Sequence, residues 1–282
     1  MKGSILKRGS GGLIFILAAV CFLLGACSPE VNLPEQYALV YGSTYAGSTV
    51  KPVLGFPDDD ARDFAAILSR KGYTVSGQIN SEATSEQLES DIESLSGIGK
   101  DGFFLFYFSG HGVSQGGSQY IVFHDGAYVS DNDLMRLISR VPSRQKVVII
   151  DACNSGGFIG DSPGVDTENS SLVFSAPEAF SKYFANIQAG DIAYTEAIVI
   201  TAAGEQDLSW EADAYGHGIF TYFLLQTPGR ADRNGDGCVT ASEAYYFTQS
   251  AVVNNWNSRQ PGRSFYPHIS GGAMDFVLFE AD

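Results

Sequence analysis

The sequence predicts an α/β domain in which a mainly parallel central sheet is flanked by helices on both faces. Apolar runs of strand length alternate along the chain with segments whose apolar residues recur at helical spacing, and this alternation is typical of parallel sheets with crossover helices. Two runs, residues 103–108 and 147–150, are apolar without interruption, as expected of strands buried on both faces. The 282-residue chain has room for one large domain, which we place at residues 37–282.

The same patterns assign the elements in order along the chain. Strands are expected at residues 37–41, 73–77, 103–108, 147–150 and 198–201, with a hairpin near 119–123 and a last strand within 274–279 that returns to the core. Helices are expected from Asp58 onward and at 84–95, 131–138, 219–225 and 241–252. Residues 154–191 interrupt the alternation, and a long polar loop of this kind is typical of a functional segment.

The N-terminal 26 residues have the pattern of a targeting segment. Lys2, Lys7 and Arg8 precede an apolar stretch at 13–24 that is short for a membrane span, and Leu24-Gly25-Ala26-Cys27 closes it. This tetrapeptide resembles the bacterial lipoprotein signal. The resemblance implies a lipid on Cys27, a tether at 27–36 and attachment to the cell envelope, at the outer membrane or its periplasmic face. An ordinary secretory signal and an uncleaved anchor helix are the alternatives.

Charge and cysteine content narrow the classes of function. Loss of residues 1–26 removes three basic and no acidic residues, which changes the formal net charge from −15 to −18. So acidic a surface repels phosphate groups and argues against a nucleic-acid partner. Cys21 and Cys27 belong to the targeting segment, so Cys153 and Cys238 are the cysteines left in the domain. They do not make a disulfide framework, and a free thiol in an exported protein suggests a chemical use.

An imidazole and a thiol follow the two most apolar strands. The first strand leads into Ser-Gly-His111-Gly112, and the second leads into Asp151-Ala-Cys153-Asn-Ser-Gly-Gly. Open α/β sheets bind ligands at the carboxyl ends of their strands, so both side chains should reach one crevice. His111 would act as base and Cys153 as nucleophile. His217 is the competing imidazole, but its place before the helix at 219–225 is more typical of a cap or packing group.

These two strings resemble the signatures of the caspase-like cysteine peptidases, the family of caspases, metacaspases and their bacterial relatives. The resemblance covers about residues 37–279 and implies the caspase-like fold and peptide-bond hydrolysis by a Cys153–His111 dyad. The backbone N–H groups of Gly112 and Cys153 would stabilise the oxyanion of the tetrahedral intermediate.

The resemblance also predicts which residues recognise the substrate. Caspases carry Ser-Trp-Arg where this chain has Ser209-Trp210-Glu211, and the reversed charge at Glu211 would repel an acidic P1 side chain, the one that precedes the cleaved bond. Metacaspase-like enzymes line this pocket with two aspartates, which correspond here to Asp60 and Asp151. Carboxylates select Arg or Lys at P1. Asp60 read alone is equally well explained as a charge at a helix start.

A second motif, residues 232–243, has the spacing of an EF-hand calcium loop. Acids and an amide stand at positions 1, 3 and 5, with Gly at 6 and Glu at 12, and oxygen ligands at this spacing suit Ca²⁺. The predicted ligands are Asp232, Asn234, Asp236, Cys238 through its carbonyl, Thr240 and Glu243. An acidic turn that holds no metal is the alternative. The sequence lacks HExxH and CxxC strings, so a catalytic zinc site is not expected.

The sequence therefore predicts an envelope-anchored cysteine endopeptidase that acts on peptide or protein substrates after Arg or Lys. It predicts calcium as a structural or regulatory ion and no organic cofactor. The alternative is a catalytically inactive caspase-like surface protein that serves as a calcium-stabilised peptide-binding or scaffold module.

Overall fold

A computed structural model describes residues 33–50, 52–115, 118–153, 196–204, 208–271 and 275–282. Its central sheet has six strands in the order β12-β8-β7-β3-β1-β2, and all neighbours except β12 and β8 are parallel. The mainly parallel sheet predicted from the sequence is therefore present. Cys27, the rest of the predicted lipoprotein signal and the loop at 154–191 lie outside the described residues.

Five parallel strands form most of the central sheet, and the two longest of them contain the uninterrupted apolar runs of the sequence. The five strands are β1 (Gln36–Gly42), β2 (Thr74–Ile79), β3 (Phe103–Gly110), β7 (Gln145–Ala152) and β8 (Glu196–Thr201). All eight residues of β3 are buried, and seven of the eight in β7 are buried. Strands covered on both faces must be apolar throughout, because neither face meets water.

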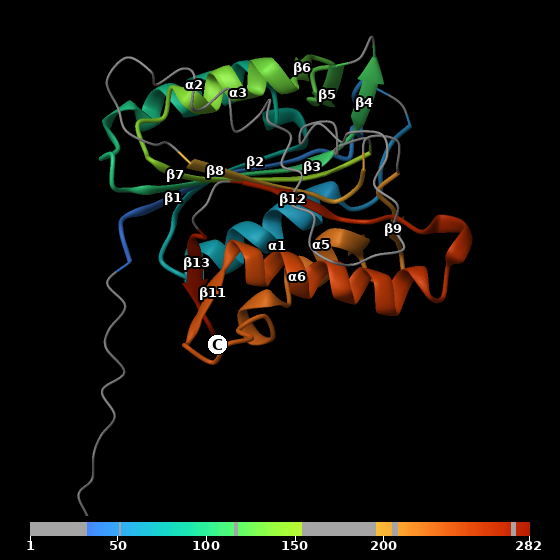
Figure 1. The fold of residues 1–282 in the computed structure, drawn as a ribbon. Helices are drawn as coiled ribbons and strands as arrows, with labels where there is room; N and C mark the ends of the chain where they lie inside the picture. Colours follow the sequence, from blue (N-terminus) through green and yellow to red (C-terminus); the bar gives the residue numbers. More distant parts are fainter. Residues whose placement is uncertain (1–32, 51, 116–117, 154–195, 205–207, 272–274) are drawn as a thin grey trace, which may run out of the picture. The chain divides into compact units, whose positions relative to one another are not determined.

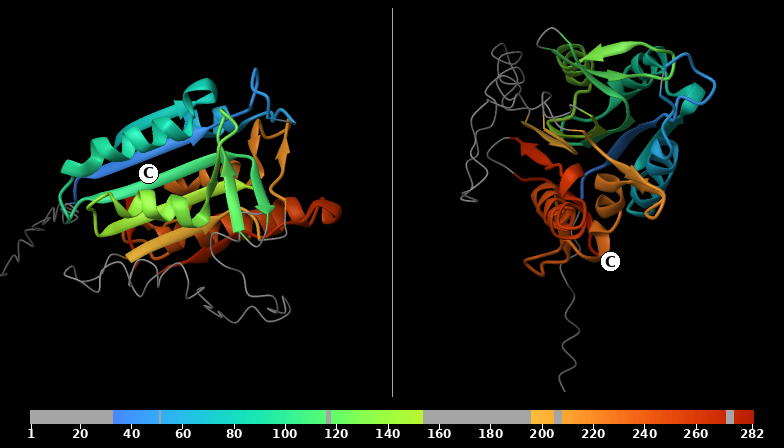
Figure 2. Two further views of the ribbon diagram at one scale, coloured as in Figure 1. Left: turned by 90° about the horizontal axis from the view of Figure 1, so that it is seen from above. Right: turned by 90° about the vertical axis from the view of Figure 1, so that its right-hand side faces the viewer.

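Helices cover the two faces of the sheet and divide the core into two clusters. On one face lie α1 (Pro57–Arg70), α5 (Ile219–Leu224) and α6 (Ala241–Ala251), and on the other lie α2 (Ser85–Ser94) and α3 (Asp131–Ser139) (Figure 1). The end-on view in Figure 2 places α3 and α6 on opposite sides of the sheet. Alternate side chains of one strand enter different clusters, as Phe104 and Leu105 do.

Helix starts follow the capping signals of the sequence. The Thr84 hydroxyl accepts the N–H of Gln87, whereas the Gln87 side chain turns to Asp91, so only one half of a capping box forms here. Thr240 and Glu243 complete a capping box at the start of α6. Three acidic residues occupy the first turn of α1, where the unpaired N–H groups favour negative charge. In the described part of the chain, no helix is long and apolar enough to cross a bilayer.

Short antiparallel pieces complete the fold around this sheet. β4 (Gly112–Gln115), β5 (Ser118–Val122) and β6 (Tyr128–Ser130) form one sheet, and β9 (Glu211–Ala212) pairs with β10 (His217–Gly218). Short 3-10 turns lie at Asn80–Glu82, Leu95–Gly97, Thr227–Gly229 and Pro261–Arg263, and a π-helix at Val252–Asn257 continues α6.

The end of the chain differs from the prediction in one respect. The last strand, β13 (Val277–Glu280), pairs with β11 (Cys238–Thr240) rather than with the central sheet. The strand that does join the central sheet is β12 (His268–Ser270), which runs antiparallel to β8 and was not predicted. The apolar side chains of β13 still enter the core, since Leu278 and Phe279 are buried, so its hydrophobicity indicated burial but not pairing.

Candidate active site

The carboxyl ends of β3 and β7 lie side by side and form what we call the nucleophile edge, His111 and Cys153. Gly110 stands opposite Ala152 in the parallel register, and His111 and Cys153 are the residues that follow next. A Cβ atom at position 112 would collide with the carbonyl oxygen of Cys153, so only glycine allows the two segments to approach this closely. The backbone thus brings the two predicted catalytic residues to one end of the sheet.

The thiol of Cys153 is half-buried and held by a backbone carbonyl. Its Sγ donates to the Ser209 carbonyl oxygen at 3.7 Å. Burial raises the pKa of this thiol, and the negative charge of Asp151 raises it further. The thiol is therefore protonated at neutral pH in this state, and it needs a base to become a nucleophile.

The imidazole of His111 is oriented by the loop that follows β1. Its Nε2 lies 2.7 Å from the carbonyl oxygen of Pro52. Because a carbonyl can only accept, Nε2 carries the hydrogen, and Nδ1 of the neutral ring is left with its lone pair. Within the described residues no hydrogen bond joins His111 to Cys153. Catalytic hydrogen bonds are often formed only when substrate is bound, so this arrangement is compatible with the predicted pair.

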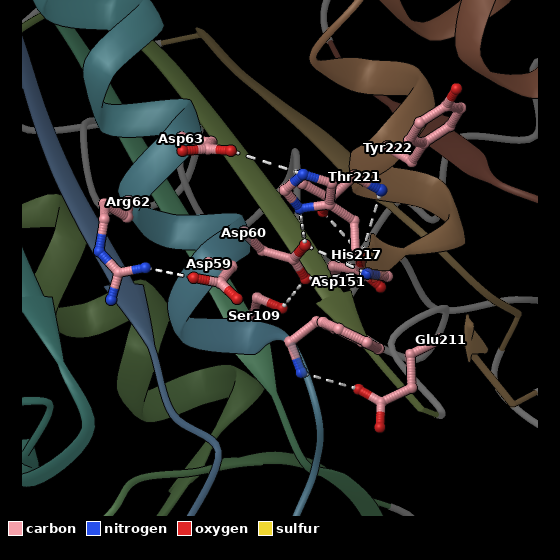
Figure 3. A network of polar contacts seen from close by, with 12 residues as sticks. Asp59, Asp60, Arg62, Asp63, Ser109, Asp151, Glu211, His217, Thr221 and Tyr222 are labelled. Atoms are coloured by element: carbon pink, nitrogen blue, oxygen red, sulfur yellow. Dashed lines mark hydrogen bonds and ion pairs between the residues drawn. The ribbon is translucent and has the colours of Figure 1, made fainter. Parts of the chain in front are cut away.

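Two buried carboxylates and an imidazole lie behind this edge and form what we call the acidic cluster: Asp60, Asp151 and His217 (Figure 3). Asp60, in the first turn of α1, is 1% exposed, and Asp151, at the end of β7, is 4% exposed. The negative charge of Asp60 raises the pKa of Asp151. The structure therefore brings the two predicted pocket aspartates together, although the elements that carry them are far apart in the sequence.

Every oxygen of these two carboxylates accepts a hydrogen bond. Asp60 accepts from the hydroxyl of Ser109 at 2.9 Å, from Nδ1 of His217 at 2.9 Å and from the N–H of Gly218 at 3.1 Å. Asp151 accepts from the hydroxyl of Ser209 at 2.5 Å and from that of Thr221 at 2.7 Å. Fully satisfied networks of this kind fix the side chains in one arrangement.

Burial and mutual repulsion keep protons in the acidic cluster. Burial, and to a lesser degree the charge of Asp60, raises the pKa of Asp151 to about 7, while the hydrogen bonds from Ser209 and Thr221 oppose the rise. Burial also raises the pKa of Asp60, although its bonds to His217 and Ser109 oppose this. The hydrogen bond and charge of Asp60 raise the pKa of His217. The cluster therefore changes its charge near neutral pH.

His217 is an ion-pair partner in this cluster, so its interpretation as a helix cap or packing group is wrong. The cap of α5 is Gly218, and it makes no side-chain hydrogen bond. The His217 ring instead turns back to α1, where Nδ1 meets Asp60 and Nε2 lies 3.5 Å from Asp63. A buried carboxylate requires a partner, and this requirement outweighs the local preference of the helix start.

Gly218 lies directly against both carboxylates. A Cβ atom at this position would lie 2.7 Å from Oδ2 of Asp151 and 3.0 Å from Oδ2 of Asp60. The N–H of Gly218 also donates to Asp60. The glycine is therefore required by close approach, and its φ does not lie in the left-handed region.

The remaining predicted substrate-binding residues surround the acidic cluster but have different partners. The carboxylate of Glu211 accepts the N–H groups of Gly55 at 2.7 Å and of Phe56 at 3.3 Å, which ties β9 to the loop before α1. The Trp210 ring lies 5.0 Å from the guanidinium carbon of Arg263. Ser209 links the two parts of the site, because its hydroxyl donates to Asp151 and its carbonyl accepts from the Cys153 thiol.

Comparison with known proteins assigns the chain to a family. The caspase domain family matches residues 35–260, which is most of the chain. The chain belongs to the caspase domain family. Membership of this family supports a cysteine peptidase type of function in general. The resemblance of the sequence to caspase-like cysteine peptidases is thereby confirmed. None of the curated proteins matches the chain significantly.

Solved structures share the fold of this caspase domain. A protein from Geobacter sulfurreducens superposes with a TM-score of 0.55 at 20% identity, over 88% of this chain and 97% of that one. Caspase-1 from Spodoptera frugiperda superposes with a TM-score of 0.54 at 14% identity, over 88% of this chain and 90% of the caspase. At these identities the likeness concerns the fold, and it confirms the predicted caspase-like α/β class.

The predicted calcium loop of this caspase domain has its own hydrogen-bond pattern. Asp232 accepts the N–H groups of Gly235 and Gly237, and both glycines have positive φ. The carboxylate of Glu243 accepts the N–H groups of Arg233 and Thr240. The donor set is of the oxygen type that Ca²⁺ prefers. Among the residues that the structure describes, no three acidic, His or Cys side chains converge as a metal site.

Tyr45, Pro52 and Thr221 are among the contributors to the site that the sequence did not predict. Tyr45 and Pro52 belong to the loop between β1 and α1. Strand β1 is parallel to β3, so the carboxyl end of β1 lies at the same edge of the sheet as the carboxyl ends of β3 and β7. The position of this loop could have indicated that its residues take part in the site, because loops at this edge of a parallel sheet surround the ligand crevice. Thr221 lies in the first turn of α5, and its hydroxyl and N–H both face Asp151.

Proposed function

We propose that this protein is a cysteine endopeptidase that hydrolyses peptide bonds with Cys153 as nucleophile and His111 as general base, after Arg or Lys at P1. The observation that carries the proposal is the placement of the nucleophile edge directly in front of the acidic cluster, with Ser209 bonded to both. A thiol, an imidazole and two carboxylates at the end of one sheet match the needs of this reaction and this substrate.

In the proposed reaction Nδ1 of His111 takes the proton from Sγ of Cys153, and the thiolate attacks the carbonyl carbon before the cleaved bond. The electron pair of the carbonyl moves to its oxygen, which the N–H groups of Gly112 and Cys153 stabilise. The intermediate collapses with cleavage of the C–N bond, and the imidazolium protonates the leaving amine. A water that gives its proton to His111 then hydrolyses the thioester, and the thiolate that leaves regains a proton.

The proposed specificity follows from the charge behind the nucleophile. Asp151 lies near the end of β7, two residues before Cys153, and this position supports its assignment as a group that meets the P1 side chain. Among the residues that the structure describes, no basic side chain is paired with Asp151, and its partners are hydroxyl and N–H groups of Ser209 and Thr221. A guanidinium or ammonium group at P1 would supply the missing positive charge.

The proposal extends to the location of the protein and to calcium. The tetrapeptide that ends in Cys27 supports anchorage of the protein to the bacterial envelope by an N-terminal lipid. The oxygen ligands at 232–243 and the positive φ of Gly237 at loop position 6 support a calcium ion with a stabilising role. We propose no nucleic-acid partner, because the net charge is strongly negative.

The experiment uses fluorogenic peptides with Arg, Lys, citrulline or Asp at P1, with and without Ca²⁺. The wild type should cleave the Arg and Lys peptides, and Cys153→Ala should abolish this cleavage. Cys238→Ala is the matched control, because it removes the other thiol of the described chain and leaves the site intact. Cleavage after Asp would overturn the specificity. A folded wild type that cuts none of the peptides but binds them would favour the peptide-binding scaffold.

A further inference from the structure

Tyr45 and the proposed catalytic base are joined by a closed circuit of hydrogen bonds. The N–H of His111 donates to Oη of Tyr45 at 2.7 Å, and that hydroxyl donates to the carbonyl oxygen of Val122 at 2.5 Å. The N–H of Val122 in turn donates to the carbonyl oxygen of His111 at 3.0 Å. The circuit uses both backbone polar groups of His111, so the main chain that carries the imidazole is fixed by one tyrosine hydroxyl and one strand of the adjoining sheet.

The ring of Tyr45 also lies against the imidazole itself. The two ring centroids are 4.6 Å apart and the ring planes differ by 28°, which is a stacked arrangement. On its edge the imidazole is held by Nε2 and the Pro52 carbonyl. The ring of His111 is therefore restrained across its face by Tyr45 and in its plane by Pro52, which leaves Nδ1 as the nitrogen without a described hydrogen bond.

The surroundings of Tyr45 are adapted to this contact. The side chain is fully buried, and its φ of 62° lies in the left-handed region, which bulky residues rarely adopt. Its N–H donates to the hydroxyl of Ser43, which holds the turn. A Cβ atom at position 110 would lie 2.6 Å from Oη of Tyr45, so the glycine before His111 makes room for this hydroxyl. Strained backbone of this kind often marks a functional site.

We propose that Tyr45 is a positioning residue for His111, whose hydroxyl fixes the backbone of the base and whose ring supports the imidazolium formed when Cys153 gives up its proton. The proposal rests on the Cys153–His111 dyad proposed above. The aromatic face attracts a cation, so stacking favours the protonated ring over the neutral one. Burial raises the pKa of the Tyr45 hydroxyl, so it stays protonated and keeps donating to Val122 while His111 changes charge.

The two contributions are separable by substitution. Tyr45→Phe removes the hydroxyl and keeps the stacked ring, whereas Tyr45→Leu removes both. Tyr73→Phe is the matched control, because the buried Tyr73 hydroxyl also donates to a carbonyl oxygen, that of Leu278, and lies away from His111. We expect Tyr45→Phe to lower kcat by roughly 10-fold to 100-fold with KM nearly unchanged, since small misplacements of a catalytic group have effects of this size. Tyr45→Leu should lower kcat further, and Tyr73→Phe should leave kcat unchanged.

The rate at which iodoacetamide alkylates Cys153 gives a readout that does not depend on peptide cleavage. Its pH profile reports the thiolate that His111 helps to form, so the profile of Tyr45→Phe should move toward that of His111→Ala, while Tyr73→Phe keeps the wild-type profile. Wild-type kcat and alkylation profile in Tyr45→Phe, or losses that only parallel its lower Tm, would overturn the role of Tyr45. Failure of the dyad itself is distinguishable, because His111→Ala would then alkylate like the wild type.

Discussion

In the acidic cluster every carboxylate oxygen has a hydrogen-bond donor, whereas at the nucleophile edge the thiol and the imidazole are held by two backbone carbonyls and not by each other. The cluster is more than nine-tenths buried at Asp60 and Asp151, while Cys153 is only half-buried. The part of the site proposed to recognise charge is thus preorganised before substrate arrives. The part proposed to make and break bonds keeps freedom to rearrange around the peptide.

The largest expected difference between the two regions appears when one imidazole is removed from each. His111→Ala should lower kcat/KM by about 10²-fold to 10⁴-fold, the usual contribution of a general base. His217→Ala should have a smaller effect on kcat, because its ring faces Asp60 and Asp63 rather than the thiol. Steady-state kinetics on an Arg peptide decides between them. A larger loss of kcat in His217→Ala would reverse the roles assigned to the two regions.

A second test asks whether the acidic cluster supplies the selectivity. Asp151→Asn keeps the shape and removes the charge, so the ratio of kcat/KM for Arg and citrulline peptides should fall by about 10-fold to 100-fold, as expected for loss of one charged hydrogen bond. Glu211→Gln should change this ratio far less, because Glu211 lies outside the acidic cluster and binds the N–H groups of Gly55 and Phe56. Equal effects of the two substitutions would contradict the assignment.

The acidic cluster should also make the stability of the folded protein depend on pH. A buried acid whose folded pKa is raised binds more protons in the folded than in the unfolded state, so it lowers stability as pH rises from its unfolded pKa. For Asp151 the destabilisation develops as the pH rises from about 4 to about 7. The raised pKa of His217 has the same sign, since its stabilisation is complete below its unfolded pKa and is lost as pH rises through the folded value.

We therefore expect Tm to fall between about pH 5 and pH 8, and the fall should be shallower in Asp151→Asn. Thermal unfolding of both proteins at constant ionic strength measures this. Cys238→Ala, outside the cluster, should keep the wild-type slope. Parallel curves for wild type and Asp151→Asn would show that the acidic cluster does not titrate in this range.

The smallest expected effect concerns the loop at 232–243, which lies outside both regions. At a free Ca²⁺ concentration about five times Kd, binding stabilises the folded state by about 1 kcal/mol. For a domain of this size that corresponds to a Tm increase of about 2–4 °C relative to a chelator. Asn234→Ala should remove the increase without disturbing the capping box of Thr240 and Glu243. An unchanged Tm in wild type on addition of Ca²⁺ would contradict the proposed ion.

Sequence patterns predicted the features that depend on local chemistry. The apolar runs of β3 and β7 identified buried strands, and strand ends in a parallel sheet meet at one edge, so the approach of His111 to Cys153 followed from two short strings. Asp151 stood out because a charged residue ends a buried strand. The proposed catalytic roles of these residues stay predictions until activity is measured.

Contacts between residues that are far apart in the sequence could not be predicted from such local patterns. His217 lies next to an apolar helix in the sequence, and no local pattern connects it with Asp60, which is 157 residues away. Tyr45 belongs to a loop of small residues, where its positive φ and its approach to His111 depend on Gly110 from another strand. β12 has three residues, too few for period-two alternation to be recognised.

The contact of Gly218 with both aspartates limits how this protein can acquire a new substrate preference. Because any larger residue there would press on Asp60 and Asp151 together, mutations at 218 should damage the packing of α1 against β10 before they alter discrimination among peptides. Under the proposed specificity, changes that alter substrate preference would begin at the carboxylates or at their hydroxyl donors, Ser109, Ser209 and Thr221. Diversification of this site is therefore confined to a few positions, each of which also stabilises the fold.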